Sequence, residues 1–170
     1  MNMFTMYYKS PIGILKLGSS QDHLLALDFE SGEEGGTDKL NPVLEEVKYQ
    51  LDQYFADKRK IFDLPLLLQG TEFQRHVWLA LQNISFGETA SYSYIAKAIG
   101  NPKAVRAVGM ANHYNPIAII IPCHRIIGSN SKLTGYAGEL WRKEWLLKHE
   151  GLSIKNNRVV TLDELPLFNL

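Results

Sequence analysis

The sequence contains one cysteine, no excess of either charge and no long apolar run. Its 170 residues include 18 basic and 18 acidic side chains, and the single cysteine is Cys123. One thiol forms no internal disulfide and does not by itself suggest a zinc cluster. We therefore expect no metal and no cofactor, and a reducing, cytoplasmic compartment. No apolar run approaches the ~18 residues of a membrane span. The start MNMFTMYYKS lacks the basic and apolar regions of a signal peptide.

Charge is divided unevenly along the chain. Residues 1–69 carry 7 basic and 11 acidic side chains, a balance of −4, whereas residues 70–151 carry 9 and 5, a balance of +4. A basic half is compatible with a polyanionic partner, although so small an excess is a weak indication. The length suits one domain or two small domains packed together. We expect an N-terminal domain at 1–69, a C-terminal domain at 70–151 and a tail at 152–170.

The N-terminal part predicts a small sheet followed by a helix. Short apolar or alternating segments predict strands over residues 5–10, 13–19 and 23–30, with breaks that suit an antiparallel hairpin or meander. Apolar residues spaced four apart predict a helix over residues 42–60. Residues 61–70 are predicted to form a last strand and a linker.

The C-terminal part predicts mostly helices. Thr71 begins a capping-box pattern that opens a helix ending near Leu81. Residues 91–99 predict a second helix. Asn101-Pro102 then predicts the N-cap and first position of a third helix over residues 103–114. Two short helices joined by a tight turn suggest a DNA-binding helix-turn-helix. With a last amphipathic helix over 138–151, the fold class is α/β, of the α+β kind.

Cys123 follows an apolar run that predicts a buried strand, and Pro122 and His124 flank it. A thiol becomes a strong nucleophile when a base or cation favours the thiolate. Neighbouring side chains on a strand face opposite ways, so Cys123 and His124 can cooperate only if the chain turns at Pro122. The plainer alternative is a cysteine that serves as a small buried hydrophobe. Spacing alone does not choose the carboxylate that would orient the base, and the candidates are Glu72, Glu88, Glu139, Glu144 and Glu150.

Six ordered blocks give the C-terminal part a specific resemblance. They are FQRHVW (73–78), FGETASYSYIA (86–96), GNPKAVRAVG (100–109), NPIAIIIPCHRII (115–127), LTGYAGEL (133–140) and KEWLLKHEG (143–151). Together they resemble the O6-alkylguanine-DNA alkyltransferases, also called methylated-DNA–protein-cysteine methyltransferases. The tetrapeptide PCHR alone would be far less specific than the ordered set. The N-terminal part is similar to the family only in length, element order and linker position.

The resemblance implies a suicidal DNA repair enzyme. Cys123 would accept the alkyl group of O6-alkylguanine irreversibly, once per molecule, with O4-alkylthymine an open second substrate. His124 would take the thiol proton through a water, and Glu150 would hold His124 in the right tautomer. Asn115 would tie the DNA-reading helix to the active-site strand, although an Asx turn before Pro116 explains it equally well. The implied partner is double-stranded DNA, which the protein would bind through the minor groove. The protein would act as a monomer and would not bind a membrane.

The resemblance also implies residues that handle the flipped base. Tyr92 would press on the phosphate of the target nucleotide and bond the base, so it counts as catalytic as well as DNA-binding. Arg106 would fill the space of the extruded guanine, although an exposed helical arginine is more often a solvated charge. The implied DNA-binding residues are Tyr92, Lys103, Ala104, Arg106, Ala107 and Gly109. The implied base pocket consists of Tyr92, Asn112, Cys123, Ile126, Tyr136, Ala137 and Gly138.

Two features leave alternatives open. Tyr136 suits core packing as well as a base pocket, and Glu139 stands where many family members have glycine, which leaves the preferred lesion size open.

Three other functions compete with repair. An alkyltransferase-like lesion binder would lack the acceptor cysteine, and a cysteine hydrolase would need an oxyanion hole for which no clear motif exists. A helix-turn-helix regulator would merely bury Cys123. One-to-one labelling by a benzylated guanine separates repair from all three.

Overall fold

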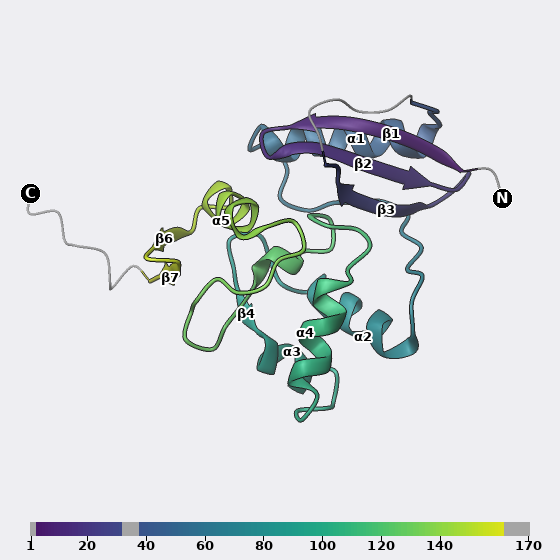
Figure 1. Cartoon of the computed structure of the whole chain (residues 1–170). Helices are drawn as coiled ribbons and strands as arrows, with labels where there is room; N and C mark the ends of the chain where they lie inside the picture. Colours follow the sequence, from purple (N-terminus) through teal and green to yellow (C-terminus); the bar gives the residue numbers. More distant parts are fainter. Residues whose placement is uncertain (1–2, 32–37, 162–170) are drawn as a thin grey trace, which may run out of the picture.

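The computed structural model describes residues 3–31 and 38–161, with a small sheet lying above a mostly helical part (Figure 1). The sheet is antiparallel in the order β1-β2-β3 and consists of β1 (Phe4–Ser10), β2 (Gly13–Ser19) and β3 (Leu24–Phe29). The prediction of three strands is confirmed. Apolar side chains of all three strands enter one core with α1 (Pro42–Phe55), which packs against β1 and β2. The α+β class predicted from the sequence is therefore correct.

Asn41 fixes the start of α1 and joins it to the turn before β3. Its side chain accepts a hydrogen bond from the Leu44 N–H at 3.0 Å and donates to the Ser20 carbonyl at 2.8 Å. The Ser19 hydroxyl adds a third bond at 3.1 Å. Because Asn41 is buried, this cap holds tertiary structure as well as the helix. The helix ends at Phe55, so the predicted end at residue 60 was too late.

The free edge of β3 is covered by two segments from distant parts of the chain. Leu24 donates to the Pro65 carbonyl at 2.8 Å, and Leu27 donates to the Pro116 carbonyl at 2.9 Å. Each segment contributes a single parallel bridge, at Leu66 and Ile117. The predicted strand within residues 61–70 was therefore wrong. Proline has no N–H to donate, so neither segment extends into a full ladder.

The three short helices of the C-terminal part lie below the sheet (Figure 1). α2 (Glu72–Leu81) has the predicted capping box, since Thr71 and Gln74 bond each other's backbone N–H groups. α3 (Tyr92–Ala98) ends before Gly100, which has a φ of +75°. α4 (Val105–His113) packs against both α2 and α3. The two helices α3 and α4 form the predicted helix-turn-helix pair.

The predicted start of α4 was wrong. Residues 101–104 form a turn in which the Ala104 N–H donates to the Asn101 carbonyl at 3.0 Å. The N-cap is Ala104, which offers no side-chain hydrogen bond. Pro102 therefore lies in the turn, outside the first helical position. The Asn-Pro pair suits a tight turn as well as a helix start, and here the turn prevails.

The apolar run before Cys123 is buried but is no strand, so that prediction was also wrong. Ile119 has a φ of +70°, and the Ile121 N–H bonds back to the Ile117 carbonyl at 3.0 Å. The chain then enters the one-turn 3-10 helix η1 (Cys123–Arg125). β5 (Ile126–Ile127) follows and pairs in parallel with β4 (Ala90–Ser91). An apolar run indicates burial and leaves the backbone conformation open.

The first half of the predicted tail is a hairpin packed on α5 (Leu140–His149). β6 (Ser153–Lys155) and β7 (Arg158–Val160) are joined by Asn156 and Asn157, both with positive φ, as a tight two-residue turn requires. The apolar patch of the tail, residues 165–170, lies outside the described residues. A second small core holds the hairpin, and its buried residues are Ile127, Leu133, Leu147 and Val159.

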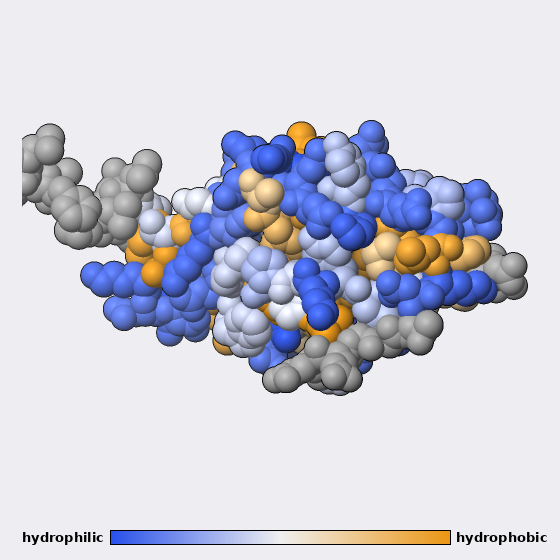
Figure 2. Space-filling model, turned by 90° about the horizontal axis from the view of Figure 1, so that it is seen from above, coloured by the Kyte–Doolittle hydropathy of each residue, from blue (hydrophilic) through white to orange (hydrophobic). Residues whose placement is uncertain are grey.

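The surface seen from above the sheet is mostly hydrophilic, with small hydrophobic patches between charged residues (Figure 2). Among residues 3–31 and 38–161, no helix is both long and apolar enough to cross a membrane.

The buried cap at Asn41 should contribute more stability than the exposed cap at Thr71. Asn41→Ala should lower the free energy of unfolding by about 2–3 kcal/mol, because it removes a cap and leaves the Ser20 carbonyl without a partner. Thr71→Ala should cost about 1 kcal/mol, since water replaces its bonds. Urea unfolding of both variants measures the difference. Equal losses would contradict the tertiary role of Asn41.

Candidate active site

Cys123 lies at the base of a cavity of about 140 Å³ between the two parts of the chain. The chain turns at Pro122, which is the condition for Cys123 and His124 to cooperate, and Cys123 begins η1 with only 5% of its surface exposed. The cavity is lined by Asp28, Phe29, His113, Asn115, Ala118, Cys123, Tyr136, Ala137 and Gly138. Asp28 and Phe29 come from β3, so the N-terminal sheet forms part of its wall.

His124 is fully buried behind Cys123 and is held by Glu150. The His124 Nε2 lies 2.8 Å from Glu150 Oε1 at the end of α5. Glu150 is thus the carboxylate, among the five candidates, that reaches the histidine. The His124 Nδ1 is buried and has no hydrogen-bond partner within the described residues. The structure therefore brings together the three residues Cys123, His124 and Glu150.

Further donors surround the Glu150 carboxylate. Arg125 donates twice, from Nε to Oε2 at 2.8 Å and from Nη2 to Oε1 at 2.9 Å. The Tyr54 hydroxyl donates to Oε1 at 2.8 Å from helix α1, in the N-terminal part. The Gly87 N–H donates weakly to Oε2, at 3.4 Å. The carboxylate is therefore fixed by three side chains from two parts of the fold.

The charges in this network set the tautomer of His124. Burial alone would raise the pKa of Glu150, but His124 and Arg125 together outweigh it and hold that pKa well below its usual value. Burial lowers the pKa of His124 despite the opposing effect of Glu150, so the ring is neutral near pH 7. A carboxylate can only accept, so Nε2 carries the proton. The Nδ1 then keeps a free lone pair and can act as a base.

The thiol stays protonated until that base acts. Burial raises the pKa of Cys123, while the Asn115 amide and the Lys143 ammonium favour the thiolate. Lys143 is itself fully buried, and burial lowers its pKa to about 8. Its Nζ donates to the carbonyls of Ile126 and Thr134. The site therefore holds a neutral thiol beside groups that stabilise the anion once it forms.

Asn115 makes both of the contacts considered for it. Its side-chain amide donates to the Ile121 carbonyl at 2.8 Å, which ties the end of α4 to the segment before Cys123. Its Oδ1 accepts from the Ile117 N–H at 3.0 Å, which is an Asx turn. The link from α4 to the segment before Cys123 and the Asx turn are thus made by the same side chain.

Residues 136–138 close the cavity against Phe29. The rings of Tyr136 and Phe29 meet edge to face, with centroids 5.9 Å apart. A Cβ on Gly138 would collide with the Phe29 ring, so only glycine fits there. The Tyr136 hydroxyl is buried without a partner in the described part of the chain, and burial raises its pKa well above the usual value. It is therefore a proton-bearing group in the cavity wall.

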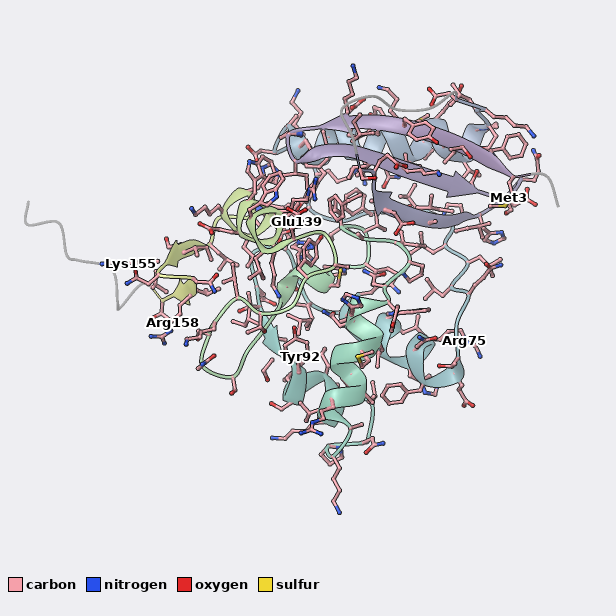
Figure 3. All side chains as sticks on the ribbon, in the orientation of Figure 1. Met3, Arg75, Tyr92, Glu139, Lys155 and Arg158 are labelled. Carbon is pink, nitrogen blue, oxygen red and sulfur yellow. The ribbon has the colours of Figure 1, made fainter. Side chains whose placement is uncertain are left out.

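Glu139 takes a conformation that favours glycine. Its φ is +72° and its ψ is 146°, a region costly for any residue with a Cβ. The carboxylate points outward, where it accepts a hydrogen bond from the Trp141 indole at 2.8 Å. Figure 3 labels this side chain beneath the sheet. Glu139 thus adds strain and a negative charge close to the cavity without lining it.

The predicted DNA-binding residues lie on or beside α4. Arg106 and Ala107 are exposed on the helix, while Lys103 and Ala104 lie in the turn before it. The Tyr92 ring lies close to Gly109, and its hydroxyl donates to the Thr134 carbonyl at 3.3 Å.

Three members of the predicted base pocket lie outside the cavity. Tyr92, Asn112 and Ile126 do not line it, although Asn112 in α4 and Ile126 in β5 are both buried. His113 and Ala118 line it in their place. Across residues 3–31 and 38–161, no group of three or more His, Cys, Asp or Glu side chains is arranged to hold a metal ion.

Besides His113 and Ala118, the sequence reasoning missed five residues that shape the site. Arg125 carried a signal, because it follows Cys123-His124 directly and an arginine within an apolar stretch needs a partner. Lys143 gave no such signal, since it lies among charged neighbours on an amphipathic helix. Tyr54, Asp28 and Phe29 reach the site only through tertiary packing.

Both parts of the chain match known families. Residues 72–152 match "6-O-methylguanine DNA methyltransferase, DNA binding domain", and residues 3–68 match "6-O-methylguanine DNA methyltransferase, ribonuclease-like domain". The methylated-DNA–protein-cysteine methyltransferase of Methanosarcina acetivorans is 49% identical over 154 residues, which cover 88% of this chain and 99% of the relative. The constitutive enzyme of that name from Bacillus subtilis is 45% identical over 164 residues, which cover 91% and 99%.

A solved structure is similar over nearly the whole fold. The crystal structure of Mycobacterium tuberculosis OGT in complex with DNA matches with a TM-score of 0.78 at 46% identity, covering 85% of this chain and 90% of that one.

Removing the charge of Glu150 should slow the reaction of the Cys123 thiol with iodoacetamide. Glu150→Gln should lower the rate at pH 7.5 at least tenfold, since an oriented base contributes about 10²–10⁴. Glu144→Gln on the same helix is the control, because that carboxylate is partly exposed and pairs with Lys148. Circular dichroism checks folding, since breaking a buried ion pair costs about 3–5 kcal/mol. Glu150→Asp keeps the charge. Equal rates in the wild type and Glu150→Gln would assign the orienting role elsewhere.

Proposed function

Because the chain belongs to the 6-O-methylguanine DNA methyltransferase family, we propose that Cys123 is the acceptor of the alkyl group. The protein is a methylated-DNA–protein-cysteine methyltransferase of DNA alkylation repair, and it binds damaged DNA. One observation above all supports the acceptor: the neutral His124, held by Glu150, directly follows the only cysteine in the sequence and keeps an Nδ1 with no partner among the described residues.

The reaction begins with proton removal. His124 Nδ1 takes the Cys123 proton through a water, and the resulting imidazolium is stabilised by Glu150. Lys143 and the Asn115 amide stabilise the thiolate. The thiolate then attacks the alkyl carbon in line with the bond to guanine O6. A C–S bond forms, the C–O bond breaks, and its electron pair leaves with the base.

Departure of the base is assisted by hydrogen-bond donors in the cavity wall. The Ala137 backbone N–H is the donor that the family resemblance assigns to O6. The Tyr136 hydroxyl lines the cavity, stays protonated and has no partner in the described part of the chain, so it can also donate to the leaving base. The thioether on Cys123 does not hydrolyse, so each molecule reacts once.

Helix α4 lies in the minor groove of the DNA. Ala104, Ala107 and Gly109 are small enough for close approach, and Arg106 is exposed where it can enter the base stack. Tyr92, packed between Gly109 and the loop at Thr134, presses on the target nucleotide. The O6 substituent cannot be attacked in line within the stack, so the base is flipped into the cavity.

The cavity is too small to hold a whole base in this conformation. Its volume of about 140 Å³ is below the roughly 300 Å³ at which small-molecule sites begin, so the loop at residues 136–138 must open to admit a base. The reacting domain is residues 70–151, and residues 1–69 support it. The protein acts as a monomer. We place it in the cytoplasm, because the acceptor must remain a reduced thiol.

Cys123 should carry the transferred group. Incubation with a duplex containing O6-methylguanine, followed by proteolysis and peptide mass analysis, should find one methyl on the Cys123 peptide and none on the Cys123→Ser variant. A methyl on another residue, or methanol released with the thiol left free, would contradict the transfer.

Arg106→Ala should impair repair of duplex DNA more than reaction with free benzylguanine. Filling the vacated stack offsets a flipping cost of a few kcal/mol, so repair should slow about tenfold to a hundredfold. The free base needs no flipping and should react at the wild-type rate. Arg106→Lys keeps the charge and separates attraction to phosphate from filling of the stack. Equal losses on both substrates would make Arg106 a structural residue.

A further inference from the structure

Three exposed cations project from the hairpin and the loop beside it. They are Lys132, in the loop after β5, and Lys155 and Arg158, on β6 and β7. We call these three residues the basic hairpin surface. Residues 126–138 and 151–161, which build it, contain no acidic residue. Among the described residues, no carboxylate pairs with any of the three cations.

The hairpin is fixed to the loop by backbone hydrogen bonds. The Val159 N–H donates to the Ser131 carbonyl at 2.9 Å, and the Leu133 N–H donates to the Asn157 carbonyl at 3.0 Å. The Arg158 Nε adds a bond to the Asn130 carbonyl at 3.1 Å. Leu133 and Val159 are buried together in the second core. The backbone under the three cations is therefore already ordered, so a ligand that contacts them has only their side chains to immobilise.

The basic hairpin surface adjoins the proposed DNA interface. The Thr134 carbonyl, two residues after Lys132, accepts the hydroxyl of Tyr92, and the Tyr92 ring lies close to Gly109 of α4. Figure 3 shows Lys155 and Arg158 projecting outward from the hairpin, with Tyr92 between them and the end of the molecule that carries α4. A duplex seated on α4 and Tyr92 would thus run beside these cations.

The proposed interface is otherwise poor in positive charge. Lys103 and Arg106 are the only cations among the residues assigned to it, and the remaining positions are small or aromatic. Arg106 would enter the stack, which leaves few cations for phosphate groups. Since affinity for duplex DNA depends mainly on neutralised phosphates, additional cations must come from neighbouring surfaces.

We propose that the basic hairpin surface binds backbone phosphates of the duplex next to the lesion. The hairpin lies just beyond the matched family region, which ends at residue 152. This inference rests on the proposed function only for the position of the duplex along α4. It extends the interface beyond the helix-turn-helix and requires no contact with base edges.

The test is the salt dependence of binding to an undamaged duplex. The variant carries Lys132→Gln, Lys155→Gln and Arg158→Gln. When the logarithm of its affinity is plotted against the logarithm of salt concentration, the slope should be shallower than that of the wild type by about 2–3, since each phosphate contact contributes about 0.9. At low salt its affinity should fall at least tenfold. The control replaces three exposed lysines of the N-terminal part, Lys9, Lys48 and Lys58, by glutamine and should keep the wild-type slope.

Two further measurements separate the possible failures. Lys155→Gln alone removes a side chain with no recorded hydrogen bond, so it should fold normally and make the slope shallower by about 0.9. Reaction of all variants with free benzylguanine should equal the wild-type rate, because that reaction needs no DNA. An unchanged slope in Lys155→Gln and in the triple variant would overturn the hairpin contact and leave the acceptor role of Cys123 intact. A wild type that binds with the steeper slope but fails to methylate Cys123 would overturn the proposed function instead.

Discussion

The carboxylate of Glu150 is the constraint on which the site depends. It accepts from His124 and Arg125 of η1 and from Tyr54 of α1, two elements far apart in the sequence. A buried carboxylate is tolerated only when such donors compensate for lost water. The three donors must therefore converge, and their convergence docks the N-terminal helix onto the end of α5. One interaction thus fixes both the base and the packing of the two parts of the chain.

Arg125 explains why this network makes a base rather than a cation. If Glu150 paired with His124 alone, its charge would favour a buried imidazolium. Arg125 neutralises the carboxylate permanently, because a guanidinium does not lose its proton in proteins. Burial then lowers the pKa of His124, and the ring stays neutral. Glu150 still accepts from Nε2, so the lone pair at Nδ1 remains available to take a proton. The imidazole of His124 becomes positively charged only when it takes a proton, and Glu150 is already placed to stabilise that charge.

The sequence predicted those features that depend on local patterns or on an ordered motif. The three strands and the capping box at Thr71 follow from residues close together in the chain. The strand predicted before Cys123 was wrong because an apolar run indicates that a segment is buried, and not that it pairs with another strand. The N-cap predicted at Asn101 was wrong because an Asn-Pro pair also suits a turn. The choice of Glu150 among five carboxylates came from the resemblance, since spacing carried no such information. Phe29 and Tyr54 were beyond reach, because only tertiary packing brings them to the site.

The N-terminal part is consequently more than a support for the reacting domain. The edge of β3 bonds to Pro116 and Ala118, which sets the depth of the segment that carries Cys123. On the other side of the cavity, the Arg142 guanidinium lies between the rings of Phe29 and Trp141, 4.9 and 4.7 Å from their centroids. It also donates to the carbonyls of Ile12 and Gly138. The sheet therefore holds the floor of the cavity through β3 and its covering loop through Arg142. Since Cys123 and the loop are positioned against the same three strands, the width of the cavity is set by the sheet, although Cys123, His124 and Glu150 come from the C-terminal part.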